Sequence, residues 1–464
     1  MSAPMGKRMS TLDSPRRRRL LKAAAASGLL AAVERHFALA QTAPDYKALV
    51  CVNLKGGNDG ENMLIPYDSA GYQAYAAVRT PESGINIPQA QLQPIQPASL
   101  ATPFGFHPAC VPLKSLFDQK KLAVVANVGT LVQPSTRAGL EAYSTPRPAN
   151  LFSHSDQEIA VQSANSAGFS RVGWGGRVAD RLDLANGGVL FPSLITTAGM
   201  MTFATGSTSI PLAIPQDPNF TLYSTGDQQF QVDALRDAAL REIVAQSRSN
   251  IYTDVAQTLA EEGLAASSVV FPILNSQKSV AAPFFAGLTS DIARQLQTAA
   301  QLIEARAQTQ LKRQVFYVQQ GGYDTHGNQA ADQGRLLGEL SQAIDAFQKA
   351  MTALGLANNV TTFTLSEFGR TWKPASNQGT DHGWGNYYLV IGDAVRGGDF
   401  YGTPPTRALN GPDDLGGDGR WIPTTSIEQY GATLARWFGI ADSDLPYVFP
   451  NIAAFANTNL GFMG

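Results

Sequence analysis

The chain has 464 residues, of which 44% are hydrophobic and 16% are charged. This composition is typical of a globular protein and excludes a disordered chain, while 43 Gly and 27 Pro indicate many loops rather than long bundled helices. Its two cysteines, Cys51 and Cys110, allow one internal disulfide or two buried thiols, and they form no C-x-x-C site.

The first 40 residues have the features of a twin-arginine signal peptide. Arg17 and Arg18 form the arginine pair, and the weakly apolar stretch at 23–33 is too short to span a bilayer. Ala38-Leu39-Ala40 offers a cleavage site with small residues at the required positions. We therefore expect the twin-arginine export machinery to deliver the chain to a periplasmic or secreted location, with 44–464 forming a single α/β domain.

The net charge of the chain after residue 40 limits the classes of partner it can bind. Without residues 1–40 it carries 27 Lys and Arg against 35 Asp and Glu, a net charge near −8. Nucleic acid binding needs clustered Lys and Arg, so we expect no nucleic acid partner. No later stretch approaches 18 uninterrupted apolar residues, so we expect no stable membrane anchor after cleavage. Because the twin-arginine route carries folded proteins, often with a metal already bound, export favours a bound ion.

Short β-branched and aromatic runs alternate with amphipathic stretches along the chain. The runs predict strands at 48–54, 122–128, 315–318, 360–365 and 387–391, and the amphipathic stretches predict helices at about 229–264, 285–310 and 336–354. The region at about 200–282 is rich in Thr, Ser and Pro and predicts an insertion or cap over the core. Thr425 with Glu428 predicts a capping box on the last helix. This alternation predicts a mostly parallel sheet covered by helices on both faces.

Polar or acidic residues follow several predicted strands. They are Asp59, Thr130, Asp324 and Glu367. Ligands of open α/β sheets gather at the carboxyl ends of the strands, so we expect these side chains to converge at one edge. The glycines around Asp59 form neither a P-loop nor a G-x-G-x-x-G motif, which leaves Asp59 as a ligand or as a β-turn aspartate.

Histidine is scarce, and its positions are informative. Of the four histidines beyond residue 40, His107 precedes a proline and is interpreted as structural. The other three stand within two positions of an aspartate, in the pairs His154 with Asp156, His326 with Asp324 and His382 with Asp381. In an extended segment residues i and i+2 point the same way, so a spacing of two allows both side chains to reach one ion.

Carboxylates and imidazoles are ligands of divalent ions such as Zn²⁺, Mn²⁺ and Mg²⁺. The candidate ligands for one or two such ions are Asp59, His154, Asp156, Asp324, His326, Glu367, Asp381 and His382. Two ions about 3.5 to 4 Å apart can hold the attacking and leaving oxygens of an ester. Thr130 or a metal-bound water would be the nucleophile. Arg137, Lys55 and Arg370 are candidate cations for a small anionic ester substrate, or ordinary surface charges.

An ordered set of motifs resembles a large bacterial family of twin-arginine-exported proteins, the domain of unknown function 1501, which is related to the alkaline phosphatase and sulfatase superfamily. The motifs are Lys55-Gly56-Gly57-Asn58-Asp59-Gly60, Phe106-His107-Pro108, Phe152-Ser153-His154-Ser155-Asp156-Gln157, Gly173-Trp174-Gly175-Gly176-Arg177, Gly321-Gly322-Tyr323-Asp324-Thr325-His326, Ser366-Glu367-Phe368-Gly369-Arg370-Thr371 and Asp381-His382. The resemblance covers essentially the whole chain after the signal segment. It implies a three-layer αβα sandwich of the alkaline phosphatase and sulfatase type.

The resemblance also implies roles for a few residues, with departures. Asp59, Thr130, Asp324 with His326, and His382 fit the superfamily order of metal ligands and nucleophile. Glu367-Phe368 stands where an Asp-His pair is expected, and the spacing from Asp324 to His326 is shorter than in the superfamily. The sulfatase nucleophile signature is absent around Val132.

Three functions are consistent with these patterns. The leading hypothesis is an exported, metal-dependent hydrolase of phosphate or sulfate esters. The second is a non-catalytic periplasmic binding or assembly protein that retains the phosphatase-like fold. The third, suggested only by the export route, is a redox protein. No G-x-S-x-G, H-E-x-x-H or cysteine-based signature supports another catalytic class.

Overall fold

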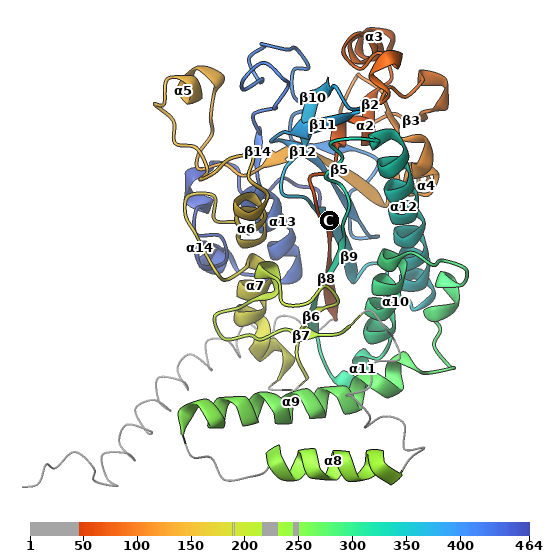
Figure 1. Ribbon diagram of the computed structural model, residues 1–464, viewed down its shortest axis with the longest axis vertical. Helices are drawn as coiled ribbons and strands as arrows, with labels where there is room; N and C mark the ends of the chain where they lie inside the picture. The colour runs from red at the N-terminus through yellow and green to blue at the C-terminus, as the bar shows by residue number, and fades with distance from the viewer. Residues whose placement is uncertain (1–45, 188, 190, 216–230, 245–249) are drawn as a thin grey trace, which may run out of the picture.

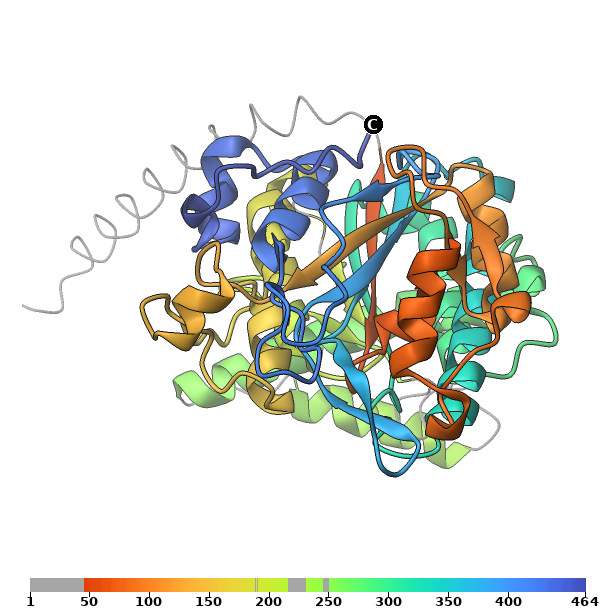
Figure 2. The same cartoon turned by 90° about the horizontal axis from the view of Figure 1, so that it is seen from above.

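A computed structural model describes residues 46–187, 189, 191–215, 231–244 and 250–464. The predicted signal peptide lies outside the described residues. A central sheet runs through the molecule, flanked by helices on both sides, as Figures 1 and 2 show. The α/β fold with a mostly parallel sheet, predicted from the sequence, is confirmed.

The central sheet has its longest strands in the middle. Its order is β13 (Phe400–Tyr401), β5 (Leu122–Gly129), β12 (Asn386–Ile391), β9 (Val360–Leu365), β1 (Lys47–Leu54), β8 (Arg313–Gln320), β6 (Leu194–Thr196) and β7 (Leu212–Ala213), with β14 (Thr425–Ser426) paired to β5. β1 pairs in parallel with both β8 and β9, whereas β12 is antiparallel to β5 and β9. The sheet is therefore mixed, with a parallel centre.

Smaller sheets lie beside this one. A hairpin pairs β10 (Arg370–Ala375) with β11 (Gly379–His382), and a three-stranded sheet joins β2 (Leu64–Pro66), β4 (Phe104–Phe106) and β3 (Gln93–Ile95). Four short or peripheral helices are α2 (Gly60–Met63), α3 (Ser69–Val78), α5 (Arg137–Glu141) and α11 (Arg306–Thr309).

Helices cover the two faces of the central sheet. One face carries α4 (Val111–Asp118), α10 (Asp291–Glu304) and α12 (Gln329–Ala353), and the other carries α6 (His154–Ser163), α7 (Trp174–Leu182), α13 (Ile427–Phe438) and α14 (Leu445–Val448). Each face encloses its own hydrophobic cluster. The three-layer arrangement thus has two cores separated by the sheet.

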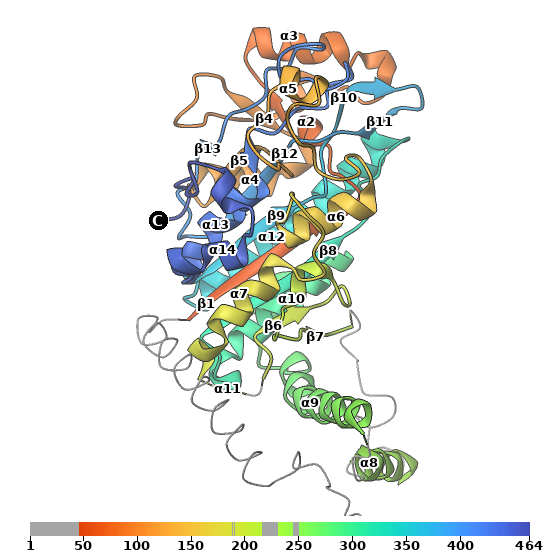
Figure 3. The same ribbon diagram turned by 90° about the vertical axis from the view of Figure 1, so that its left-hand side faces the viewer.

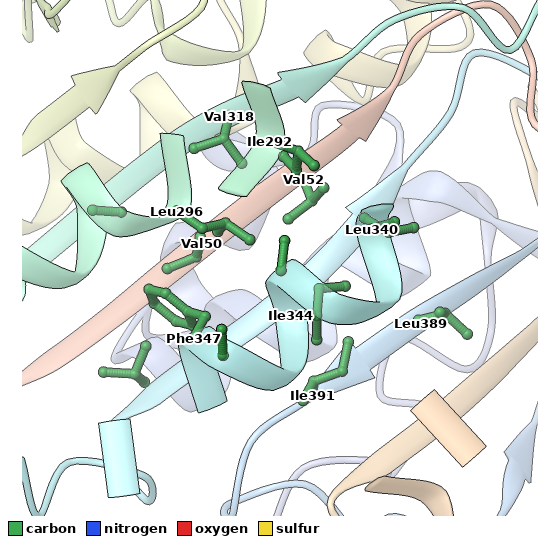
Figure 4. Packing of buried hydrophobic residues seen from close by; sticks show 14 of the residues in the cluster. Val50, Val52, Ile292, Leu296, Val318, Leu340, Ile344, Phe347, Leu389 and Ile391 are labelled. Atoms are coloured by element: carbon green, nitrogen blue, oxygen red, sulfur yellow. The ribbon is translucent and has the colours of Figure 1, made fainter. Parts of the chain in front are cut away.

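Alternation along β1 explains how one strand serves both cores. Val50 and Val52 pack in the cluster with α10 and α12, as Figure 4 shows, whereas Leu49 and Cys51 pack in the opposite cluster. Successive side chains of a strand point to opposite faces, so a fully apolar run is typical of a strand covered on both sides. Cys110 lies in the first cluster, on the face opposite Cys51, and both thiols are free and buried.

The helical stretch predicted at 229–264 contains two helices, α8 (Gln231–Val244) and α9 (Ile251–Leu274), with 245–249 outside the described residues. Figure 3 shows both helices projecting away from the sheet. The predicted helical character is confirmed in both, and in α8 the side chains of Leu235 and Ile243 are exposed. The far end of α9 reaches the core through Val270 and Ile273. The assignment of 200–282 as an insertion or cap stays a prediction.

Two further expectations change in detail. The predicted helix at 285–310 is divided into α10 and α11. The capping box of α13 uses Ser426 and Gln429 rather than the predicted Thr425 and Glu428, because β14 extends through Ser426 and the helix starts one residue later. No described helix is both long and apolar enough to cross a bilayer, and the 24-residue α9 is long enough but not sufficiently apolar.

His107 is buried beside α12 and is neutral at physiological pH. Its Nδ1 accepts a hydrogen bond from the Ala109 backbone N–H at 3.1 Å, and burial lowers its pKa from 6.5 to about 4. This geometry agrees with the structural interpretation of His107.

The low pKa of His107 predicts a loss of stability in acid. The unfolded chain takes up the proton near pH 6.5 and the folded chain only near pH 4, so the contribution is complete above pH 6.5 and is lost as the pH falls toward 4. The loss is about 3 kcal/mol. Urea unfolding at pH 7.5 and pH 4 should show a smaller pH dependence in His107→Asn, which keeps an acceptor without a titrating ring. Equal pH dependence in both proteins would contradict the prediction.

Candidate metal centre

Three neighbouring parallel strands deliver the candidate residues to one edge of the sheet. β9, β1 and β8 are in register, with Asn53 opposite Leu365 and Leu54 opposite Gln320. Their carboxyl ends therefore place Gly56, Asp324 and Glu367 close together. The hairpin β10–β11 adds His382 directly opposite Arg370, and α6 adds His154 at its first residue.

Three imidazoles and one carboxylate meet at this edge. Nε2 of His326 lies 2.9 Å from Nε2 of His382 and 3.0 Å from Asp324 Oδ1. Asp324 is also 3.4 Å from Nε2 of His382 through Oδ1 and 3.4 Å from Nε2 of His154 through Oδ2. Asp324 and His326 thus do come together, but in a turn rather than in the extended segment expected, since the His326 N–H donates to the Asp324 carbonyl oxygen at 3.0 Å.

The orientation of His154 is set by a buried glutamate. Its Nδ1 lies 3.0 Å from Glu367 Oε1, and since a carboxylate only accepts, Nδ1 carries the proton. This hydrogen bond raises the pKa of His154, against the opposing effect of burial. Nε2 is left as a buried nitrogen with no hydrogen-bond partner, facing Asp324. Glu367 also accepts from the Gly56 N–H at 2.8 Å.

His382 is oriented in the same manner by a backbone carbonyl. Its Nδ1 donates to the carbonyl oxygen of Phe152 at 2.7 Å, so the neutral ring presents a lone pair at Nε2. Burial of His382 lowers its pKa, against the opposing effect of the Phe152 bond. The Phe368 ring stacks on His382 with centroids 4.8 Å apart and also packs against His154. The rings of His154 and His382 are therefore both held with Nε2 directed toward Asp324.

Asp324 is held by a buried cation. Arg370, whose side chain has no exposed surface, donates from Nη1 to Asp324 Oδ1 at 2.7 Å. Burial would raise the pKa of Asp324, but the Arg370 hydrogen bond and charge lower it overall. Gly56 allows this approach, because its φ of +116° suits glycine and an added Cβ would lie 2.3 Å from the Asp324 nitrogen.

The donor atoms fit one small divalent ion. Ligands at about 2.0–2.1 Å around a tetrahedral ion are separated from one another by about 3.3 Å. The separations of 2.9 to 3.4 Å among His326 Nε2, His382 Nε2 and Asp324 Oδ1 are of this size, and His154 Nε2 lies 3.4 Å from the other oxygen of Asp324. The buried, unpartnered Nε2 of His154 is a second indication, because buried nitrogens normally find a partner. His and Asp side chains thus form groups that could hold a metal ion, His154–Asp324–His382 and His326–Asp381–His382.

Comparisons with known proteins identify the family. The sequence profile of a family described as "Protein of unknown function (DUF1501)" matches residues 46–415. The chain belongs to this family. The resemblance drawn from the motifs is thereby confirmed. A search of curated proteins gave no match.

Solved structures align with the DUF1501 chain at low identity. The PsFucS1 sulfatase from Pseudoalteromonas sp. is 9% identical, with 93% of this chain and 73% of that chain covered and a TM-score of 0.34. The C-terminal periplasmic domain of EcEptC from Escherichia coli in complex with Zn is 11% identical, with 86% and 83% covered and a TM-score of 0.33. The lipoteichoic acid synthase LtaP from Listeria monocytogenes is 8% identical, with 86% and 73% covered and a TM-score of 0.32. These alignments carry no argument about activity.

Asp59 is engaged elsewhere in this DUF1501 member. Its two carboxylate oxygens accept hydrogen bonds from Arg79, at 2.7 and 3.1 Å, and both side chains of the pair are fully buried. Oδ1 also accepts from the Glu61 N–H and Oδ2 from Gln329. The structure does not group Asp59 with the histidines, because the guanidinium and the start of α2 occupy its oxygens.

Asp156 lies on the same helix as His154, α6, but its side chain is engaged away from the site. Its carboxylate accepts from Ser153 at 2.7 Å and from Asn150 at 3.1 Å, and the Ser153 bond lowers its pKa. His154 and Asp156 do not point the same way, because the segment is helical, and residues i and i+2 of a helix do not share a face. Asp381 remains at the rim, 3.9 Å from His326 Nδ1.

The predicted nucleophile and cations are likewise engaged with other groups. The Thr130 hydroxyl is buried and donates to Gln157 at 2.6 Å, and Arg137 contacts Glu141 and the Gly411 carbonyl. Thr130 follows β5, which β12 separates from β9, so its strand end is displaced from the centre. Lys55 lies 3.4 Å from Glu158, one helical turn after His154.

Sequence reasoning missed two features of the site. Arg370 was considered only for a substrate anion, although its position opposite His382 in the β10–β11 hairpin makes it the partner of Asp324. The short sequence between Arg370 and His382, with turn residues at its centre, was a signal for that hairpin. The Phe152 carbonyl could not be found, because a backbone acceptor leaves no mark in residue identity.

The Asp59–Arg79 pair gives a prediction that separates structural from metal-binding acids. Asp59→Asn leaves the buried Arg79 without a carboxylate, and we expect the unfolding free energy to fall by about 3–5 kcal/mol. Metal content per folded chain should stay unchanged, measured by elemental analysis beside urea unfolding. Asp442→Asn, which removes an exposed partner of Arg436, is the control and should alter neither quantity. Loss of metal without loss of stability would instead make Asp59 a ligand.

Proposed function

We propose that this chain is an exported, metal-dependent hydrolase of phosphate or sulfate esters, with one divalent ion held at the candidate metal centre by His154, Asp324, His326 and His382. The observation that carries the proposal is the convergence of three Nε2 atoms on one carboxylate, each 3.0 to 3.4 Å from an oxygen of Asp324. The unpartnered Nε2 of His154 supports it.

The donor set favours Zn²⁺ or Mn²⁺ over Mg²⁺. Imidazole nitrogen suits Zn²⁺ and its neighbours in the first transition row, whereas Mg²⁺ takes oxygen ligands and retains waters. Glu367 behind His154 and the Phe152 carbonyl behind His382 are the outer partners that metal-binding histidines usually have.

The shared residue His382 favours one ion rather than two. Its Nδ1 is committed to Phe152, so only Nε2 is available, and His382 belongs to both three-residue groups. One lone pair binds one ion at a time. The two-ion arrangement expected from the superfamily order also lacks Asp59, which is paired with Arg79.

The chain's own residues prepare the centre for an anionic ester. A bound divalent ion would polarise the ester oxygen and lower the pKa of a bound water. Arg370 neutralises Asp324, so a dication leaves net positive charge at the site. His154 stands at the first residue of α6, where the helix dipole favours negative charge. Lys55, nearly half exposed, supplies a further cation beside α6.

A second candidate function is metal binding without catalysis. The observation that favours it is the position of the predicted catalytic groups. Thr130 is bonded to Gln157, and Arg137 is bonded to Glu141, so neither stands at the centre. A periplasmic binding or assembly protein would need the ion only for structure or ligand capture.

Metal content and ester hydrolysis together test the proposal. We expect the purified chain to hold about one Zn or Mn ion by elemental analysis and to hydrolyse p-nitrophenyl phosphate, bis-p-nitrophenyl phosphate or p-nitrophenyl sulfate. His382→Ala should lose the ion and reduce hydrolysis at least about 100-fold, because it removes the nitrogen common to both groups. His107→Asn, a histidine outside the centre, is the matched control.

The outcomes separate the two functions. A bound ion with no hydrolysis of any of the three esters, before or after reconstitution with Zn²⁺ or Mn²⁺, would favour the binding protein. A chain that takes up neither ion would reject both functions.

A further inference from the structure

The residue that orients His382 is itself in an unusual backbone conformation. Phe152 has a φ of +76°, in the left-handed region that side chains other than glycine rarely adopt. In this conformation its carbonyl oxygen accepts the Nδ1–H of His382 at 2.7 Å. Such strained residues persist only where surrounding contacts hold them, and they gather at functional sites.

The side chain of Arg420 contacts Phe152, His382 and Asp381. Its guanidinium lies over the Phe152 ring, with Cζ 5.2 Å from the ring centroid. Its Nε donates to the carbonyl oxygen of His382 at 3.0 Å, and its Nη2 lies 3.4 Å from Asp381 Oδ2. Its Nη1 pairs with Asp418 Oδ2 at 2.9 Å. One side chain thus touches the strained residue, the histidine and the acid beside the histidine.

These contacts join two segments that are far apart in the sequence. Phe152 lies two residues before His154, at the start of α6, and His382 ends β11. The backbone N–H of Arg420 is itself held by the buried Asp414. The Arg420 contacts therefore fix the separation between two donors of the candidate metal centre, although Arg420 contributes no ligand.

We propose that Arg420 is a positioning residue of the candidate metal centre, which holds Phe152 and His382 so that the His382 Nε2 faces the ion. The inference rests on the metal centre of the proposed function and adds to it a residue beyond 415, where the family match ends. A surface ion pair with Asp418 alone would give Arg420 no effect on the ion.

The planar guanidinium is needed for this role. It can stack on an aromatic ring through its face while its edge donates in three directions. Lysine has a single point charge, and it cannot contact the ring, the carbonyl and two carboxylates at once. Arg420→Lys should therefore restore only part of the arrangement.

Metal affinity and a cobalt spectrum test the role. We expect Arg420→Gln to weaken Zn²⁺ binding about 10- to 100-fold, the usual effect of losing an outer partner of a metal ligand. The affinity of Arg420→Lys should lie between those of the unaltered chain and Arg420→Gln. The affinity is measured by competition with a chromophoric chelator. Visible absorption of the Co²⁺-loaded proteins should change in Arg420→Gln, because the His382 nitrogen shifts. Phe152→Leu, which removes the ring and keeps the carbonyl, should weaken binding less.

Arg436→Gln is the matched control. Arg436 is a partly exposed arginine that contacts an aspartate and a backbone carbonyl, as Arg420 does, but it lies on α13. It should leave both the affinity and the cobalt spectrum unchanged. If the role of Arg420 were purely structural, Arg420→Gln and Arg420→Lys would both have lower thermal stability, but the cobalt spectrum of the folded proteins would not change.

The possible failures are distinguishable. If the unaltered chain binds Co²⁺ and Zn²⁺ but Arg420→Gln matches it in affinity and spectrum, the positioning role is rejected and the metal centre stands. If the unaltered chain binds neither ion, the metal centre itself is rejected and the positioning role with it. If Arg420→Gln does not fold, Arg420→Lys and Phe152→Leu decide, and unchanged affinity in both would reject the role.

Discussion

The parallel pairing of β1 with β8 and β9 is the constraint on which the candidate metal centre depends. The register of these strands fixes where each one ends, and so places Gly56, Asp324 and Glu367 side by side. Because β1 buries side chains on both faces, a shift of one residue would exchange the two cores. Packing on both faces therefore holds the register, and the register holds the centre.

Pairing of charges then decides which acid remains available. Asp59 and Asp324 both follow strands of this group, and each has a buried arginine partner. The Asp59–Arg79 pair is completely enclosed, whereas the side chain of Asp324 keeps 44% of its surface exposed. Removing a buried charge from water is costly unless it is paired, so the Asp59–Arg79 pair is fixed in place. Asp324 can face both Arg370 and the histidines.

The sequence predicted the layers and the edge of the site, since these follow from local periodicity and strand order. It could not tell which acids meet the histidines. The same spacing of two occurs at Asp324–His326 and His154–Asp156, yet the first lies in a turn beyond β8, where the His326 N–H donates to the Asp324 carbonyl oxygen, and the second lies in α6. The partner of Asp59 is at the end of α3, at a distance along the chain that no pattern reveals. The apolar spacing at 229–264 predicted helix correctly but did not show that Leu235 and Ile243 of α8 would be exposed.

The two oriented histidines of the centre have different surroundings, and this sets how protons compete with an ion at each. Glu367 raises the pKa of His154, whereas burial lowers that of His382. As the pH falls, His154 takes up its second proton before His382 does, and a protonated ring cannot donate a lone pair to a metal. As the pH falls, the ion therefore loses His154, the donor on α6, first. His382, whose pKa burial lowers and whose ring the Phe152 carbonyl orients, keeps its nitrogen available to a lower pH, and it is the histidine shared by both three-residue groups.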